Sequence, residues 1–176
     1  IGTRNEKKVK ENNKKKFEIR KTDWYNISSL RDICSDIQVV VHASGMNASN
    51  CLNDPSAALE FNGLATLRFV EAVSRTNVEQ FIFLSTAHVY SSPLEGIINE
   101  STCPRNLHPY ATSNIAGENA VLHNSKKTDL SVKILRLSNV FGRPVDKNVD
   151  CWMLFVNDLC RQAVTNNQLN IMDNGG

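Results

Sequence analysis

The sequence has no long hydrophobic run. None of its stretches approaches the roughly 18 consecutive apolar residues that a membrane-spanning helix needs. Its first residues, IGTRNEKK, lack the hydrophobic region of a signal peptide. These two absences predict a cytoplasmic protein with no membrane partner.

Paired cysteines are also missing. The five cysteines are scattered and never form a Cys-x-x-Cys motif, so their spacing encodes neither a disulfide framework nor a zinc site. The histidines share no metal-ligand spacing either, and we expect no metal. These residues are Cys34, Cys51, Cys103, Cys151, Cys160, His42, His88, His108 and His123.

Charge of either sign is modest overall. The net charge is +2, with 41% hydrophobic and 22% charged residues, which is typical of a globular protein. Residues 4–21 hold nine Lys or Arg and three Glu, a local +6 that leaves −4 for the remainder. This segment has few aromatics, so a solvated helix and loop is favoured over a nucleic-acid interface. The length of 176 residues favours one domain, 1–176.

Short apolar runs alternate with helical stretches. Strand-like runs lie at 17–21, 37–43, 80–86 and 130–138. The chain opens on IGT, which resembles the end of a strand, and closes on LNIMDNGG, which resembles a strand and a turn. The clearest helix is predicted at 55–76, with Asp54 as its N-cap. This alternation predicts an α/β doubly wound fold, a parallel sheet with helices on both faces and ligands at the carboxyl ends of its strands.

Those strand ends carry the candidate chemistry. The runs VVVHASGMN, FIFLSTAHVYS and LRLSNVFGRP all finish in small or polar residues, as close approach to a flat ring or a phosphate requires. A further helix begins at Pro109-Tyr110. In this arrangement the hydroxyls of Thr86 and Tyr110 can converge on one substrate oxygen, with Thr86 as a hydrogen-bond partner and Tyr110 as the general acid or base.

Five motifs, in order along residues 1–176, resemble the extended short-chain dehydrogenase/reductases, in particular the NAD-dependent epimerase/dehydratase branch that acts on nucleotide sugars. FIFLSTAHVYS is similar to its Ser-Ser/Thr-x-x-Val-Tyr-Gly strand end. NESTCPRNLHPYATSNIAGE resembles its Glu-x-x-Pro and Pro-Tyr-x-x-Ser-Lys succession, and RLSNVFGRP its Arg-x-x-Asn-Val-Tyr-Gly-Pro. DPSAALEFNGLAT and KTDW resemble its Asp-Pro helix and the Asp after its third strand. The resemblance implies a Rossmann-like domain that is incomplete at both ends.

The resemblance also implies roles for individual residues. Those implied for the cofactor are Arg4, Asp23, Trp24, Ala43, Ser44, Gly45, Asn62 and Leu137. Those implied for catalysis are Thr86, Tyr110 and Asn114, and those implied for the substrate are Ser85, Thr86, Tyr110 and Asn139 with Ser138 beside it. Two alternatives stay open, because Asp23 could cap the next helix and Asn62 could be a buried structural hydrogen bonder.

Three features depart from the family pattern. The Gly-x-x-Gly-x-x-Gly turn that holds the cofactor pyrophosphate is absent, and so is the C-terminal substrate-binding part. We therefore expect the sequence to be a fragment. We also expect calorimetry to show that it binds a dinucleotide weakly. Asn114 stands where the family has the lysine that lowers the pKa of the tyrosine. Arg4 stands where NAD enzymes have an acidic residue, which gives a lean towards the 2′-phosphate of NADP.

We therefore expect an NAD(P)-dependent nucleotide-sugar epimerase, dehydratase or reductase that transfers a hydride at a sugar carbon. One alternative is a non-catalytic dinucleotide-binding protein, because the lysine is lost. Another is an NADPH-dependent reductase of a non-sugar carbonyl, which Arg4 favours. The resemblance further suggests a homodimer packed through the helices that begin near Pro55 and Tyr110.

Overall fold

The computed structural model of the protein describes residues 2–3, 16–91, 93–144, 151–152 and 154–171. The chain divides into two separate units, Ile1–Leu137 and Ser138–Gly176. Arg4 and most of the basic segment 4–21 lie outside the described residues. The described part contains no helix that is both long and apolar enough to cross a membrane.

The first unit alternates strands and helices in the predicted manner. Its strands are β1 (Gly2–Thr3), β2 (Arg20–Lys21), β3 (Val39–His42), β4 (Gln80–Thr86) and β5 (Ser131–Leu137). Its helices are α2 (Ile27–Asp32), α3 (Ala48–Asn53), α4 (Pro55–Ala58), the π-helix η2 (Leu59–Ala65), α5 (Thr66–Val73), the 3-10 helix η3 (Ala87–Val89) and α6 (Pro109–Ser125). The second unit contains α7 (Phe155–Asn166).

The strand predictions vary in accuracy. The strand at 80–86 is confirmed at both ends, while those at 37–43 and 130–138 are slightly shorter than predicted and the one at 17–21 shrinks to β2. The closing strand is wrong for 169–171, which have no regular structure. No strand in the described part of the second unit offers these residues a hydrogen-bonding partner, and Leu169 and Ile171 are mostly exposed.

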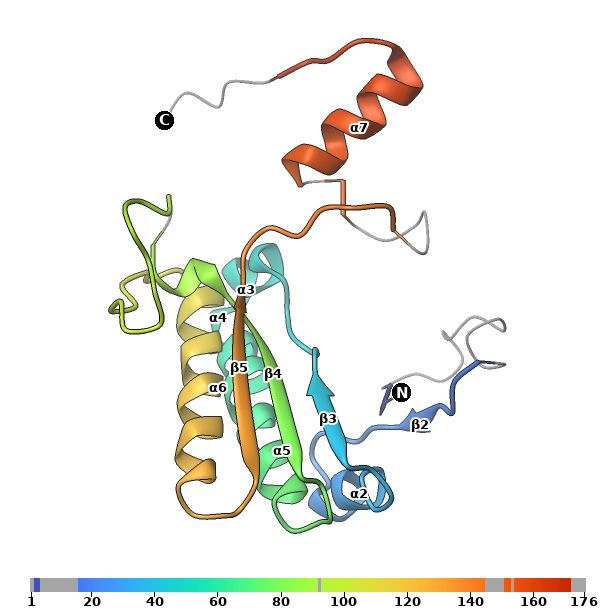
Figure 1. The fold of residues 1–176 in the computed structure, drawn as a ribbon, viewed down its shortest axis with the longest axis vertical. Coiled ribbons are helices and arrows are strands. Elements are labelled where there is room, and N and C mark those ends of the chain that lie inside the picture. Colours follow the sequence, from blue (N-terminus) through green and yellow to red (C-terminus); the bar gives the residue numbers. More distant parts are fainter. Residues whose placement is uncertain (1, 4–15, 92, 145–150, 153, 172–176) are drawn as a thin grey trace. The chain divides into compact units, whose positions relative to one another are not determined.

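The strands form two separate sheets, and both are parallel. The three-stranded part has the order β3-β4-β5, and the two-stranded part pairs β1 with β2. A cavity of about 460 Å³ is lined by residues of β1, β2 and β3. Helices α5 and α6 pack against one face of the three-stranded part (Figure 1). Both faces were predicted to be covered, but in the described part Val39 and Val41 on the other face are about half exposed.

The predicted helix at 55–76 is present but not regular. Asp54 caps it as predicted, accepting a hydrogen bond from the backbone N–H of Ala57 at 2.9 Å. The middle of the helix is the π-helical segment η2, and the regular turns end at Val73. Helix α6 packs closely against this segment because Gly117 has no side chain. A Cβ at Gly117 would lie 2.6 Å from the backbone oxygen of Asn62 and 3.1 Å from the ring of Phe83.

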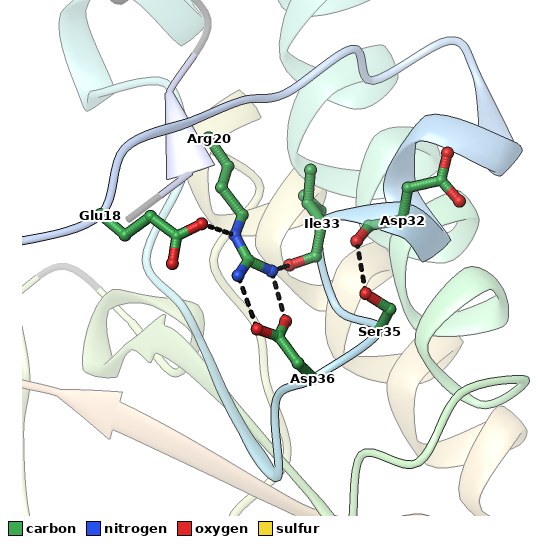
Figure 2. A network of polar contacts seen from close by, with 6 residues as sticks. All are labelled: Glu18, Arg20, Asp32, Ile33, Ser35 and Asp36. Carbon is green, nitrogen blue, oxygen red and sulfur yellow. Dashed lines mark hydrogen bonds and ion pairs between the residues drawn. The ribbon is translucent and has the colours of Figure 1, made fainter.

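An arginine joins β2 to the turn before β3 (Figure 2). Arg20 donates two hydrogen bonds to the carboxylate of Asp36, at 2.6 and 2.8 Å, and one to the backbone oxygen of Ile33 at 2.8 Å. It also donates to Glu18 at 2.8 Å. Hydrogen bonding to Arg20 holds the pKa of both carboxyls below their usual values. This network lies at the amino ends of the strands, opposite the edge where the strands end.

A histidine is buried in the aromatic core of the first unit. His42 is 3% exposed, and its ring lies 5.3 to 5.5 Å from those of Trp24, Phe69 and Phe83. Its Nε2 is 2.9 Å from the hydroxyl of Thr66. Burial lowers the pKa of His42 to about 4, so the imidazole is neutral at physiological pH.

This burial predicts a loss of stability in acid. The unfolded chain binds a proton near pH 6.5 and the folded chain only near pH 4, so the contribution is complete above pH 6.5 and is lost as the pH falls. We expect the free energy of unfolding to drop by about 3 kcal/mol between pH 7.5 and pH 4 on this account. Chemical denaturation of the wild type and of His42→Phe at both pH values measures this drop in the free energy of unfolding. The matched control is His123→Gln, an exposed position. An equal pH dependence in wild type and His42→Phe would contradict this assignment.

Candidate active site

The carboxyl ends of β3, β4 and β5 meet at one edge of the sheet. Thr86 ends β4, and its register partner Leu137 ends β5. Strand β3 ends at His42 and runs directly into residues 43–45. Three of the segments that carry the predicted site residues therefore start from the same edge, as a parallel sheet requires.

Tyr110 and Thr86 lie together at this edge. Tyr110 is in the first turn of α6, and its phenol lies close enough to the side chain of Thr86 for that side chain to lower the pKa of the phenol. The Thr86 side chain is buried, and its oxygen also accepts a hydrogen bond from the backbone N–H of His88 at 3.2 Å. The backbone N–H of Tyr110 donates to Nδ1 of the N-cap residue His108 at 3.1 Å. The hydroxyl of Thr86 and the backbone of Tyr110 are thus fixed by local turn and helix chemistry.

The surroundings of Tyr110 favour its neutral form. Burial raises the pKa of the phenol, the hydrogen bond with Thr86 lowers it, and the nearby Cys51 thiol raises it, with a net upward shift. None of the interactions behind this shift comes from a cation in the described part of the chain. At neutral pH this tyrosine is therefore a proton donor.

Asn114 turns its amide back towards its own helix. The side chain is 7% exposed, and its Nδ2 donates to the backbone oxygen of Tyr110 at 2.7 Å. This hydrogen bond joins residues four apart, where side chains and carbonyls of a helix are neighbours. An amide carries no charge, so Asn114 cannot lower the pKa of the phenol as a lysine would.

Asn62 joins the loop after β3 to α6. Its Oδ1 accepts from the backbone N–H of Met46 at 2.8 Å, and its Nδ2 donates to the hydroxyl of Ser113 at 3.0 Å. Ser113 in turn donates to the backbone oxygen of Tyr110 at 3.2 Å. Asn62 is 2% exposed, so these hydrogen bonds form away from water. It is a structural hydrogen bonder that also supports the backbone of the candidate acid.

A cavity of about 240 Å³ lies at the end of β3. Four of the residues predicted to bind the cofactor line it, namely Trp24, Ala43, Ser44 and Gly45. Two buried polar atoms at this cavity, Nε1 of Trp24 and Oγ1 of Thr22, have no hydrogen-bond partner in the described part. Such atoms are costly unless a ligand or water satisfies them. The small residues 43–45 let a flat ligand approach the backbone closely.

The other predicted site residues have different positions. Asp23 is exposed and accepts a hydrogen bond from the backbone N–H of Tyr25, while Asn26 caps α2, so Asp23 is not the helix cap. Ser85 points its hydroxyl into the protein, towards α6, rather than towards the edge. Asn139 and Ser138 belong to the second unit, and Arg4 lies outside the described residues. Within the described residues, no group of three His, Cys, Asp or Glu side chains could hold a metal ion.

One polar network was not predicted from the sequence. The carboxylate of Glu118 on α6 accepts hydrogen bonds from Ser85 of β4 and from Arg136 of β5, and Arg136 also donates to the hydroxyl of Tyr90. A signal was present, because Glu118 lies eight residues after Tyr110, about 80° away around the axis of α6 and so on the same broad face. That spacing alone does not reveal which charge on another strand meets it.

The sequence as a whole decides the family. A model of the "NAD dependent epimerase/dehydratase family" matches residues 1–175. The chain belongs to the NAD-dependent epimerase/dehydratase family. The predicted family and its enzymatic character are thereby confirmed.

The names of curated relatives describe enzymes that act on nucleotide sugars. The chain is 25% identical over 115 residues to a UDP-glucose 4-epimerase of Streptococcus mutans, covering 65% of this chain and 34% of the relative. It is 27% identical over 127 residues to a dTDP-glucose 4,6-dehydratase of Streptomyces griseus, covering 72% and 39%.

A solved structure supports the same family. The structure of MoeE5 in complex with UDP-glucose and NAD is 28% identical, with a TM-score of 0.68, and the match covers 82% of this chain and 48% of MoeE5. This likeness confirms the predicted Rossmann-like α/β fold. This chain spans less than half the length of each of these three proteins.

Proposed function

We propose that the protein is an NAD(P)-dependent nucleotide-sugar epimerase or dehydratase in which Tyr110 is the acid and base. The observation that carries this proposal is the position of the Tyr110 phenol beside the Thr86 side chain at the carboxyl edge of a parallel sheet. That edge is where ligands of this fold bind, and two adjacent hydroxyls there can hold one substrate oxygen.

The chemistry needs a hydride and a proton to move together. A dinucleotide held by Trp24, Ala43, Ser44 and Gly45 would supply the hydride chemistry. Tyr110 takes the proton of the sugar hydroxyl in the first step, oxidation, and gives it back to the carbonyl oxygen in the second, reduction. Thr86 orients the same oxygen by a hydrogen bond. Since the pKa of Tyr110 is raised, the second step is favoured at neutral pH and the first is slowed.

The residues at the cavity fit part of a dinucleotide. Trp24 offers a flat wall, and Ala43, Ser44 and Gly45 are small residues that allow close approach. Asp23 and Leu137 keep their proposed cofactor roles, whereas Asn62 supports the loop after β3 from inside the protein. Because MoeE5 was solved in complex with NAD, we propose NAD rather than the predicted lean towards NADP.

Of the two reactions we favour epimerisation. Oxidation and reduction at one carbon need one acid–base group, which Tyr110 provides. Elimination of water needs further groups, one to remove a carbon-bound proton and one to protonate the leaving hydroxyl. UDP- and dTDP-sugars are the proposed substrate class, because the curated relatives carry them in their names.

The test is turnover by the full-length protein. We expect UDP-glucose or dTDP-glucose, incubated with the protein and NAD, to give the C4 epimer, seen by NMR spectroscopy as a second set of sugar resonances. A product lighter by one water molecule would make the protein a dehydratase. Absence of any product from either substrate, with or without added cofactor, would contradict the proposal.

One observation favours a second candidate, a dinucleotide-binding protein with impaired catalysis. Asn114 leaves Tyr110 without a nearby cation in the described part. Tight binding of NAD by calorimetry together with no turnover would support this candidate.

We also propose a homodimer that forms through η2, α5 and α6. An apolar groove of about 550 Å³ lies along these helices, and Leu59 and Leu64 in it are about half exposed. Exposed apolar surface of this kind is typical of an interface between subunits. We expect Leu64→Glu to halve the mass of the full-length protein in sedimentation experiments. The control is Leu52→Glu on α3, which is similarly exposed but outside the groove. A wild-type monomer would contradict the proposal.

A further inference from the structure

Glu118 is a buried carboxylate that the proposed chemistry does not use. It is 2% exposed, and its Oε1 accepts a hydrogen bond from the hydroxyl of Ser85, with 2.5 Å between the two oxygens. Arg136 donates to the same carboxylate through Nη2 at 2.6 Å and through Nε at 3.0 and 3.1 Å. A carboxylate is costly to bury unless it is paired and hydrogen-bonded in this way. The arrangement therefore holds three elements in one fixed geometry.

These contacts converge on the strand end that carries Thr86. Ser85 directly precedes Thr86 in β4, and Arg136 is the register partner of Ser85 in β5. Arg136 also donates to the hydroxyl of Tyr90 at 2.6 Å, and Tyr90 is the C-cap residue that follows η3. Thr86 itself caps the start of η3. The short turn that begins at Thr86 is thus held at both ends.

The same contacts fix the helix that carries Tyr110. Glu118 lies about two turns after Tyr110 in α6, and a helix is stiff over that distance. Joining Glu118 to Ser85 sets the position of α6 relative to the end of β4. The distance between the hydroxyls of Thr86 and Tyr110 depends on that position.

We propose that Ser85, Glu118 and Arg136 form a positioning network for the Thr86–Tyr110 pair. The inference rests on the proposed function, in which that pair handles the substrate proton. It gives Ser85 a different task from the substrate contact that the sequence predicts, because its hydroxyl proton is already used by Glu118.

Kinetics of the full-length protein distinguish the two tasks. If Ser85 is a positioning residue, Ser85→Ala lowers kcat by about 10-fold to 100-fold and leaves KM unchanged, because misplaced reacting groups slow the chemical step. Glu118→Gln acts in the same direction. If Ser85 instead contacts the substrate, Ser85→Ala raises KM, and that result overturns the proposal.

The matched control is Val121→Ala. Val121 lies on α6 in the apolar core, fully buried, and its side chain makes none of the hydrogen bonds of the network. It shows what a loss of stability alone does to the rate, and we expect its kcat to stay at the wild-type value at temperatures where it is folded. An equal fall of kcat in Val121→Ala and Ser85→Ala would overturn the proposal.

A second readout needs no turnover. The chain has three tyrosines, Tyr25, Tyr90 and Tyr110, so tyrosine labelled with ¹³C at Cζ gives few signals, and Tyr110→Phe assigns the one of interest. We expect Ser85→Ala to move the Tyr110 resonance in the same direction as Thr86→Val does, because both break or weaken the hydrogen bond between the pair. An unmoved resonance in Ser85→Ala overturns the positioning role, whereas missing turnover with a moved resonance counts only against the proposed function.

Discussion

Changing Tyr110 to phenylalanine should lower kcat for the nucleotide sugar by about 10²-fold to 10⁴-fold, the usual contribution of one acid–base group. The change removes only the hydroxyl, whose partner is Thr86, and leaves the ring in its place at the start of α6. Stability should change little, because one hydrogen bond contributes about 1 kcal/mol net. Steady-state kinetics with the NMR assay for the C4 epimer measure the effect.

The matched control is Tyr25→Phe, at a tyrosine that is 71% exposed. It should keep wild-type kinetics. If Tyr110→Phe kept at least half of the wild-type kcat, the acid–base role of Tyr110 would be wrong, and a different group at the sheet edge would carry the proton.

Changing Asn114 to lysine should raise kcat at neutral pH by about 10-fold to 100-fold. A positive charge about 4 Å from the phenol is worth on the order of 4 kcal/mol at an effective dielectric near 20, or roughly 3 pKa units. It would counteract the burial that now raises the pKa of Tyr110. The ionised phenol, which removes the proton of the sugar hydroxyl, would then be more populated.

The pH profile gives the sign of this effect. In the wild type we expect the rate to rise with pH into the alkaline range, because the base form of Tyr110 appears only above its raised pKa. In Asn114→Lys that rise should move to lower pH. Asn114→Met, which has similar length without charge, should leave the profile in place. No gain and no shift in Asn114→Lys would mean that another group already supplies the charge.

Part of the candidate site follows from local sequence signals. A parallel strand that ends in Ser85-Thr86 and a helix that starts at Pro109-Tyr110 must bring their ends to one edge, since crossover topology leaves few other arrangements. The structure brings these hydroxyls together, while their catalytic roles stay predictions. The Asp54 cap followed from equally local chemistry.

The rest depends on contacts between distant elements. The π-helical turns of η2 occur where Gly117 lets α6 approach, and no residue inside 55–76 reveals that contact. The pairing of Glu118 with Arg136 needs the register of β4 and β5. The strand predicted after α7 failed for a related reason, because an extended segment becomes a strand only where a neighbour accepts its hydrogen bonds.

Gly117 constrains the geometry of the proposed site although it does not line the edge. A Cβ there would lie 2.6 Å from the backbone of Asn62 and 3.1 Å from Phe83, so any side chain would push α6 outwards. Tyr110, Ser113 and Glu118 lie on that helix and would move with it. Gly117 therefore restricts which residues this position tolerates, although it contacts no reactant. Related sequences should vary as little at position 117 as at Tyr110.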